Sequence, residues 1–335
     1  MAIKGELILI KYILKSGIRM ILLILAISIA AFFLMTISPI DPLQTNVGQT
    51  ALGIMSQEQI EQLQMYWGTN ENVVERYLTW IKDFISGDMG TSLLYHQPVH
   101  DVIVQRLFNS MGILLCAWLL SGIFGVILGM LAGANEGSIV DTSIKGIAIL
   151  FSSTPVFWFA LIVLLLFSVW LKWFPIGFSV PIGVMAENVS LLDKIHHGVL
   201  PTFVLSIAGM PNIILHTREK MSSVLKSDYI LFARALGKTK KQILWQHGLR
   251  NVLLPAITLQ FASISEIFSG SILAEQVFSY PGLGQIAVTA GLGGDMPLLL
   301  AVVVICACFV CGGNFLADII YHIIDPRIQV KGKQL

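Results

Sequence analysis

The sequence predicts an all-α polytopic membrane protein with six transmembrane helices. Of its 335 residues, 55% are hydrophobic and only 12% are charged, whereas soluble proteins carry about 25% charged residues. Six apolar runs each approach or exceed the length of about 20 residues that a helix needs to cross a bilayer. Because a water-facing fold cannot bury so much apolar surface, we expect a chain embedded in a membrane.

The six runs lie at residues 18–38, 111–133, 146–171, 199–217, 254–277 and 297–320. The first is too long for the apolar core of a signal peptide and has no small-residue cleavage site after it, so we interpret it as a retained helix. Eight of the 21 Lys and Arg residues fall between Arg218 and Arg250, and the 278–296 loop has none. The positive-inside rule then predicts that the 218–253 loop and both termini are cytoplasmic.

Residues 39–110 are too polar to be membrane-embedded, so we expect a small helical extracytoplasmic insertion within a single transmembrane domain of residues 1–335. Ser56 and Gln59 have the spacing of a capping box, which predicts a short helix to about Trp67. Asn70 is the expected cap of a second helix, which Gly87 ends.

Two of the membrane runs are expected to be interrupted. Pro155 interrupts the third run, because proline removes a backbone donor and clashes with the preceding turn. Gly270, between two serines, is expected to loosen the fifth. Breaks are tolerated where protein or a cavity covers the backbone, so both positions indicate either a translocation path or a purely structural kink.

Short motifs lie in order along nearly the whole chain. They are Pro39-Ile40-Asp41-Pro42, Gly87-Asp88-Met89-Gly90-Thr91-Ser92, Ser153-Thr154-Pro155-Val156-Phe157-Trp158, His197 to Leu200-Pro201, Glu275 with Phe278 and Pro281-Gly282-Leu283-Gly284, and Asn314, Asp318 and Tyr321 followed by Asp325-Pro326-Arg327. Together they resemble the motifs of one family, the membrane permeases of binding-protein-dependent ABC importers for dipeptides, oligopeptides, nickel and opine-type metal chelates. The resemblance implies the type I importer permease fold.

The resemblance implies that the loop at residues 218–253, called the basic loop, carries a coupling helix that docks on an ATPase subunit in the cytoplasm. Asp228 is expected at the start of that helix, where an acid favours the dipole. Ala233, Ala235 and Gly237 supply small residues for close approach and a sharp turn, and Arg234 contacts the ATPase or lipid headgroups.

A second short helix is expected at about residues 239–251. The sequence contains no Gly-x4-Gly-Lys-Ser/Thr motif, so we expect a non-enzymatic subunit without a cofactor of its own. The resemblance implies two separate ATP-binding subunits that hold ATP and magnesium. It also implies a second related permease chain, an extracytoplasmic solute-binding protein and the lipid bilayer of the cytoplasmic membrane, with no nucleic acid.

Four polar residues within the apolar runs are candidates for a role in the path or in helix contacts, because uncompensated charge is costly there. Glu266 is expected either to line the path or to bond to a nearby serine, and Glu275 to act on the path as a gate contact or as a structural cap. Asn314 and Asp318 are expected to bond across helices. The histidines have no metal-ligand spacing, so no metal site in the chain is predicted.

Glu266 and the sequence Gly294-Asp295-Met296-Pro297, which lacks the Arg and Tyr frequent in peptide-type relatives, favour nickel or a metal chelate as the substrate. Import of di- or oligopeptides by the same mechanism is the alternative. An ion-coupled secondary transporter is an alternative of another class, although the inverted repeats of such folds are not visible.

Overall fold

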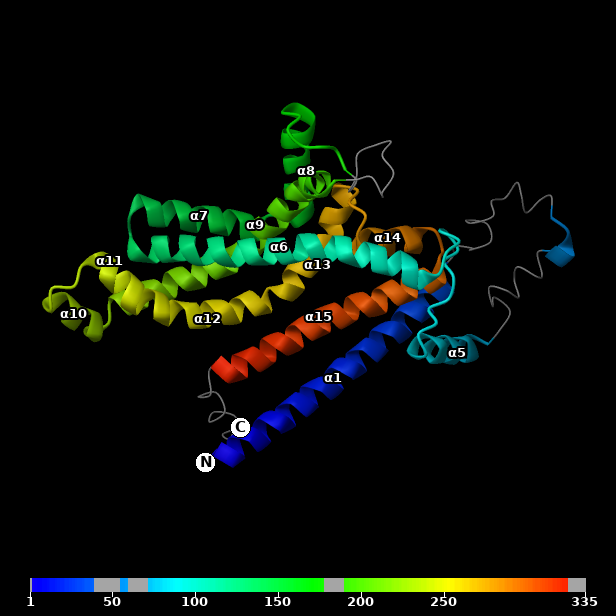
Figure 1. Cartoon of the computed structure of the whole chain (residues 1–335), viewed down its shortest axis with the longest axis horizontal. Coiled ribbons are helices and arrows are strands. Elements are labelled where there is room, and N and C mark those ends of the chain that lie inside the picture. Colours follow the sequence, from blue (N-terminus) through cyan, green and yellow to red (C-terminus); the bar gives the residue numbers. More distant parts are fainter. Residues whose placement is uncertain (1, 39–54, 60–71, 178–189, 325–335) are drawn as a thin grey trace. The chain divides into compact units, whose positions relative to one another are not determined.

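The computed structural model describes residues 2–38, 55–59, 72–177 and 190–324. Regular structure within these residues is helical (Figure 1). The motif parts at 39–42 and 325–327, Asn70, and the predicted helix beyond Gln59 lie outside them. The elements are α1 (Ala2–Ile37), α5 (Val73–Ile85), α6 (Val99–Ala134), α7 (Ile139–Ser153), α8 (Val156–Leu164), the π-helical η1 (Leu165–Trp170), α9 (Leu191–Leu225), α10 (Asp228–Ala235), α11 (Lys240–Ile243), the π-helical η3 (Leu244–Gly248), α12 (Leu249–Ala262), α13 (Ile264–Val277), α14 (Leu283–Leu292) and α15 (Met296–Ile324).

The six predicted spans correspond to helices of sufficient length and apolarity. Four are α1, α6, α9 and α15, and two are bent pairs: α7 with α8 and η1, and the α11–α12 segment with α13. The bends are 105° and 45°. The all-helical fold with six candidate spans is therefore confirmed, and two of the six are broken.

Packing divides the chain into two compact units. The first comprises residues 1–13, 111–280 and 312–335, and the second comprises residues 14–110 and 281–311. The prediction of one permease domain stays a prediction.

In the first unit, α9 is the central helix, with α7, α8, α12 and α13 packed on it. It continues through Pro201 and Pro211. A row of glycines on α6, Gly125, Gly129 and Gly133, faces α9 so closely that a Cβ at Gly129 would lie 2.6 Å from the Cβ of Thr217. Small residues at four-residue spacing let membrane helices approach at backbone distance.

In the second unit, the first turns of α6 pack with α14 and the start of α15 around residues such as Val99, Ile286 and Leu298. The side chain of Tyr77 on α5 packs on Phe32 of α1, and its hydroxyl hydrogen-bonds that of Ser28 at 2.8 Å. The helical insertion is thus joined to its neighbours by a small core of its own.

Three predictions about the insertion can be compared with the structure. The capping box is confirmed, because the Ser56 backbone donates to the Gln59 side chain at 3.0 Å and the Gln59 backbone donates to the Ser56 hydroxyl at 3.3 Å. The predicted cap of the second helix was two residues off: α5 is capped by Asn72, whose side chain accepts from the Val74 N–H. Gly87, with φ +94°, lies just beyond the C-cap of α5, as predicted.

Candidate functional site

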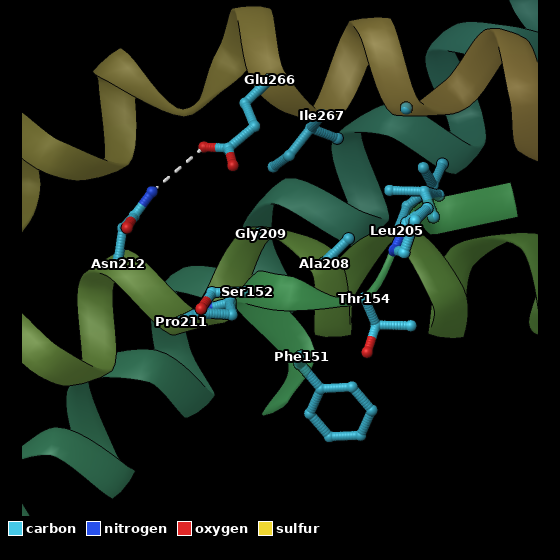
Figure 2. Close-up of a pocket in the computed structure, with 13 residues that line it drawn as sticks. Phe151, Ser152, Thr154, Leu205, Ala208, Gly209, Pro211, Asn212, Glu266 and Ile267 are labelled. Atoms are coloured by element: carbon cyan, nitrogen blue, oxygen red, sulfur yellow. Dashed lines mark hydrogen bonds between the residues drawn. The ribbon is translucent and has the colours of Figure 1, made fainter. Parts of the chain in front are cut away.

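A cavity of about 250 Å³ lies in the first unit, lined by the break between α7 and α8, by the first half of α13 and by α9 (Figure 2). Pro155 and Glu266, both predicted to lie on a translocation path, are in its wall, and Glu275 is not among its lining residues. The lining residues are Phe151, Ser152, Thr154, Pro155, Val156, Leu205, Ala208, Gly209, Pro211, Asn212, Glu266, Ile267 and Gly270.

The break between α7 and α8 follows from Pro155. Thr154, which precedes the proline, is extended with ψ 122°, as residues before proline prefer. Its hydroxyl donates to the Leu150 carbonyl at 2.8 Å, and the Ser152 hydroxyl donates to the Ile149 carbonyl at 2.9 Å. The serine and threonine hydroxyls thus occupy carbonyls at the end of α7, where the helical ladder stops.

The break in the fifth span lies at Ser263, so the prediction that Gly270 loosens this span at its own position was wrong. Ser263 is both the C-cap of α12 and the N-cap of α13. Gly270 lies inside α13, and a Cβ there would be 3.4 Å from Leu205 and 3.6 Å from Val156. Both distances are ordinary van der Waals contacts, so a methyl group would fit between α13 and its neighbours α8 and α9 beside the cavity.

Glu266, in the first turn of α13, is the sole ionisable side chain among the described lining residues. Figure 2 shows its carboxylate facing Asn212 of α9, whose amide Nδ2 donates to Oε2 at 3.4 Å. The nearby serines bond elsewhere: the Ser269 hydroxyl donates to the Ser265 carbonyl and that of Ser263 to the Gln260 carbonyl. Glu266 is thus an exposed acid at the cavity, bonded to an amide.

Asn212 is a site residue that sequence reasoning missed. Its signal was a polar amide directly after Pro211 inside an apolar run, and such amides often bond between membrane helices. The other predicted polar residues take different places. Glu275 is fully buried on α13, and the Ser265 hydroxyl donates to Asn314 Oδ1 across two helices. A path role for Glu275 and a cross-helix bond of Asp318 stay predictions.

The predicted coupling helix is α10, which begins at Asp228 and is followed by Gly237 with φ +80°. Ala233 is buried, with 4% exposure, against Val224, Ile230 and Ile243. It therefore packs α10 against the end of α9 and against α11. Ala235 and Arg234 are exposed.

The predicted second helix of this loop does begin at Thr239, through a complete capping box with Gln242. The predicted end at Asn251 was wrong, because the chain passes through η3 and continues helically to Ala262. Leu254 and Pro255 do not stop it, since the helix tolerates the proline within α12.

An apolar stripe of α10 faces outward from the loop. It consists of Tyr229, Phe232 and Leu236, spaced three and four residues apart as on one side of a helix. Phe232 is 67% and Leu236 is 65% exposed. Such exposed aromatic and aliphatic side chains next to basic residues are typical of a contact with another protein or with a membrane surface.

Comparison with known proteins places these features in a family. Residues 125–330 match the family described as "Binding-protein-dependent transport system inner membrane component", and residues 9–113 match its N-terminal counterpart. The oligopeptide transport system permease protein AppB of Bacillus subtilis is 36% identical over 321 residues, covering 95% of this chain and 99% of AppB. The di/tripeptide transport system permease protein DppB of Pseudomonas aeruginosa is 29% identical over 319 residues, covering 90% and 94%.

A solved structure of the MetNI methionine ABC transporter in an inward-facing conformation resembles this chain with a TM-score of 0.53 at 17% sequence identity. The similarity covers 67% of this chain and 96% of that chain. It supports the type I ABC importer permease fold. The chain belongs to the family of inner membrane components of binding-protein-dependent transport systems.

Proposed function

We propose that this permease subunit of a binding-protein-dependent ABC importer carries di- or oligopeptides across the cytoplasmic membrane. The observation that carries the proposal is the match, along more than nine-tenths of the chain, to a permease named for oligopeptides. A permease named for di- and tripeptides matches over a similar length. The cavity adds chemistry that suits a peptide, since a carboxylate and an amide can pair with an ammonium group and a peptide N–H or C=O.

Nickel and metal chelates, which the sequence alone favoured, have less support than peptides. The relatives are named for peptide transport. The described residues contain no group of three metal-ligating side chains, and the cavity offers one carboxylate without imidazole or thiolate. Nickel sites in proteins draw on such nitrogen and sulfur ligands.

The energy for transport is proposed to come from two ATP-binding subunits that hold ATP and magnesium. We place one of them on the apolar stripe of α10, with a second related permease chain completing the path and a solute-binding protein on the extracytoplasmic face. Both termini are then cytoplasmic, on the same side as the basic loop.

The proposed contact predicts that Phe232→Asp uncouples the importer. A carboxylate in an apolar docking pocket loses burial and adds a desolvation cost, and central aromatic residues contribute about 2 kcal/mol or more to such interfaces. ATPase subunits should therefore co-purify at least tenfold less well with the variant. Leu292→Asp, at a 71% exposed position in the second unit, is the control. Unchanged co-purification of the Phe232 variant would contradict the docking role.

Peptide import is tested by uptake into proteoliposomes that contain the complete complex, with labelled dipeptide, oligopeptide and nickel compared side by side. We expect uptake of peptide that requires both ATP and the binding protein. The same assay separates ABC import from ion-coupled secondary transport, because only the former needs soluble partner subunits. Uptake of nickel without uptake of either peptide would overturn the proposed substrate.

Glu266 gives a prediction within this assay. Glu266→Gln keeps the size of the side chain and its bond to Asn212 but removes the charge. An exposed charge contact contributes about 0.2–1 kcal/mol, so uptake of peptides with a free amino terminus should fall by a factor of roughly 1.4–5. The same peptides with an acetylated amino terminus should be carried equally by variant and wild type. An equal effect on both would assign Glu266 to structure.

A further inference from the structure

The end of α9 beside the coupling helix is tied to the start of α7 by a buried ion pair. The Asp141 carboxylate, 4% exposed, accepts from Arg218 Nε and Nη2, both at 2.7 Å. The Gly137 N–H donates to the same carboxylate at 2.9 Å. Two parallel bonds from one guanidinium fix direction as well as distance, so α7 and α9 are held in one orientation at this point.

A second set of contacts holds the α6–α7 turn, residues 135–138, to the same region. Glu136 Oε2 accepts from the Ser222 hydroxyl at 2.6 Å and from Lys226 Nζ at 2.7 Å. The hydrogen bond from Lys226 has the larger effect and that from Ser222 the second largest, and both lower the pKa of Glu136. Lys240, the first residue of α11, donates to Asn135 Oδ1 at 3.1 Å. The turn therefore contacts both sides of the coupling loop.

The coupling helix α10 cannot move independently of the end of α9, which carries Arg218 and also Ser222, a residue that bonds to the α6–α7 turn. Only Lys226 and Ser227 separate the end of α9 from the start of α10. The small core of Val224, Ile230, Ala233 and Ile243 packs the end of α9, α10 and α11 together. A displacement of α10 must consequently displace the end of α9, which carries Arg218.

On the other side of the ion pair, α7 leads to the cavity. Asp141 lies in the first turn of α7, which has 15 residues and is therefore roughly 22 Å long. Its far end lies at the 105° bend, where Phe151, Ser152 and Pro155 line the cavity. One regular helix thus joins the ion pair to the wall of the candidate path.

We propose that the Asp141–Arg218 ion pair transmits motion of the coupling helix to α7 and so to the cavity wall at residues 151–155. Asp141 and Arg218 are then positioning residues for transport, acting through α7 on a site that neither contacts. The proposal rests on the proposed docking of ATPase subunits at α10. It differs from a purely structural role in one measurable respect, because breaking the link changes how much substrate moves per ATP hydrolysed.

The experiment compares wild type with Asp141→Asn in proteoliposomes containing the complete complex. Peptide uptake and ATP hydrolysis are measured on equal amounts of assembled complex. Asparagine keeps the shape but loses the charge, so we expect the peptide-to-ATP ratio to fall roughly fivefold or more, the lower range of coupling between sites. Glu219→Gln removes an exposed acid next to Arg218 and is expected to keep the wild-type ratio. A wild-type ratio in assembled Asp141→Asn would overturn the proposal.

Assembly is checked first by size-exclusion chromatography of the complex. If Asp141→Asn does not assemble, the ratio is measured on Arg218→Lys, which keeps the charge but not the two parallel bonds. A wild-type ratio there would assign the pair to folding alone and overturn the proposal. Wild-type complex that imports no peptide would instead contradict the proposed substrate. Stimulation of ATP hydrolysis by the binding protein then replaces the ratio as the readout, with the same expected loss.

Discussion

Replacing Asp295 with alanine is expected to destabilise the second unit strongly. The Asp295 side chain is fully buried and precedes α15. It accepts from the Ser92 hydroxyl at 2.5 Å, from the Leu94 N–H at 3.1 Å and from the Leu298 N–H at 3.2 Å. Alanine would leave three buried or half-buried donors unpaired, at about 1–3 kcal/mol for each. The expected loss is therefore about 3 kcal/mol or more.

Thermal unfolding of the purified subunit in detergent measures this effect. Asp88→Ala is the matched control, because Asp88 accepts one backbone hydrogen bond, from Gly90 at 2.8 Å, in an exposed turn of the same insertion. We expect its loss to be about 1 kcal/mol or less. Equal melting temperatures for the two variants would show that the bonds of Asp295 are not what holds the insertion to α15.

The spans and one of their breaks were predictable because they depend on local chemistry. Apolar length alone defines the six candidate spans, and the break at Pro155 follows the expected loss of a backbone donor and clash with the preceding turn. Pro201, Pro211 and Pro255, by contrast, lie inside continuous helices. The break at Ser263 was not predictable in this way, because no breaking residue stands there. Gly270 was misread because a glycine need not interrupt a helix: α13 continues through this position, where a Cβ would meet Leu205 and Val156 at ordinary van der Waals distances.

The candidate site was predictable only in part. The sequence singled out Pro155 as a helix breaker and Glu266 as an acidic residue within an apolar run. The fold brings both residues to one cavity. Contacts between distant residues carry no local pattern. The bond from Ser92 to Asp295 joins residues 203 positions apart, and the bond from Arg218 to Asp141 joins residues 77 apart. Only the three-dimensional arrangement reveals them.

Gly133→Ala is expected to push α6 away from α9. A Cβ at Gly133 would lie 2.5 Å from the backbone carbonyl oxygen of Arg218 and 2.7 Å from the Cβ of Met221. A carbonyl oxygen cannot move aside by a change of rotamer, so the helices themselves must separate. Overpacking of this kind costs about 1–3 kcal/mol and occasionally more, which exceeds the gain of about 0.5–1 kcal/mol from replacing glycine by alanine in a helix.

Gly112→Ala provides the control on the same helix, because no atom lies within 4 Å of a Cβ built there. It should gain the helix-propensity benefit without an overlap and melt at or slightly above the wild-type temperature. Gly133→Ala should melt lower, and because Arg218 and its partner Asp141 lie at the same contact, it should also lower the peptide-to-ATP ratio. If the two alanine variants melt together, α6 and α9 do not approach at backbone distance, and the glycine row has no packing role.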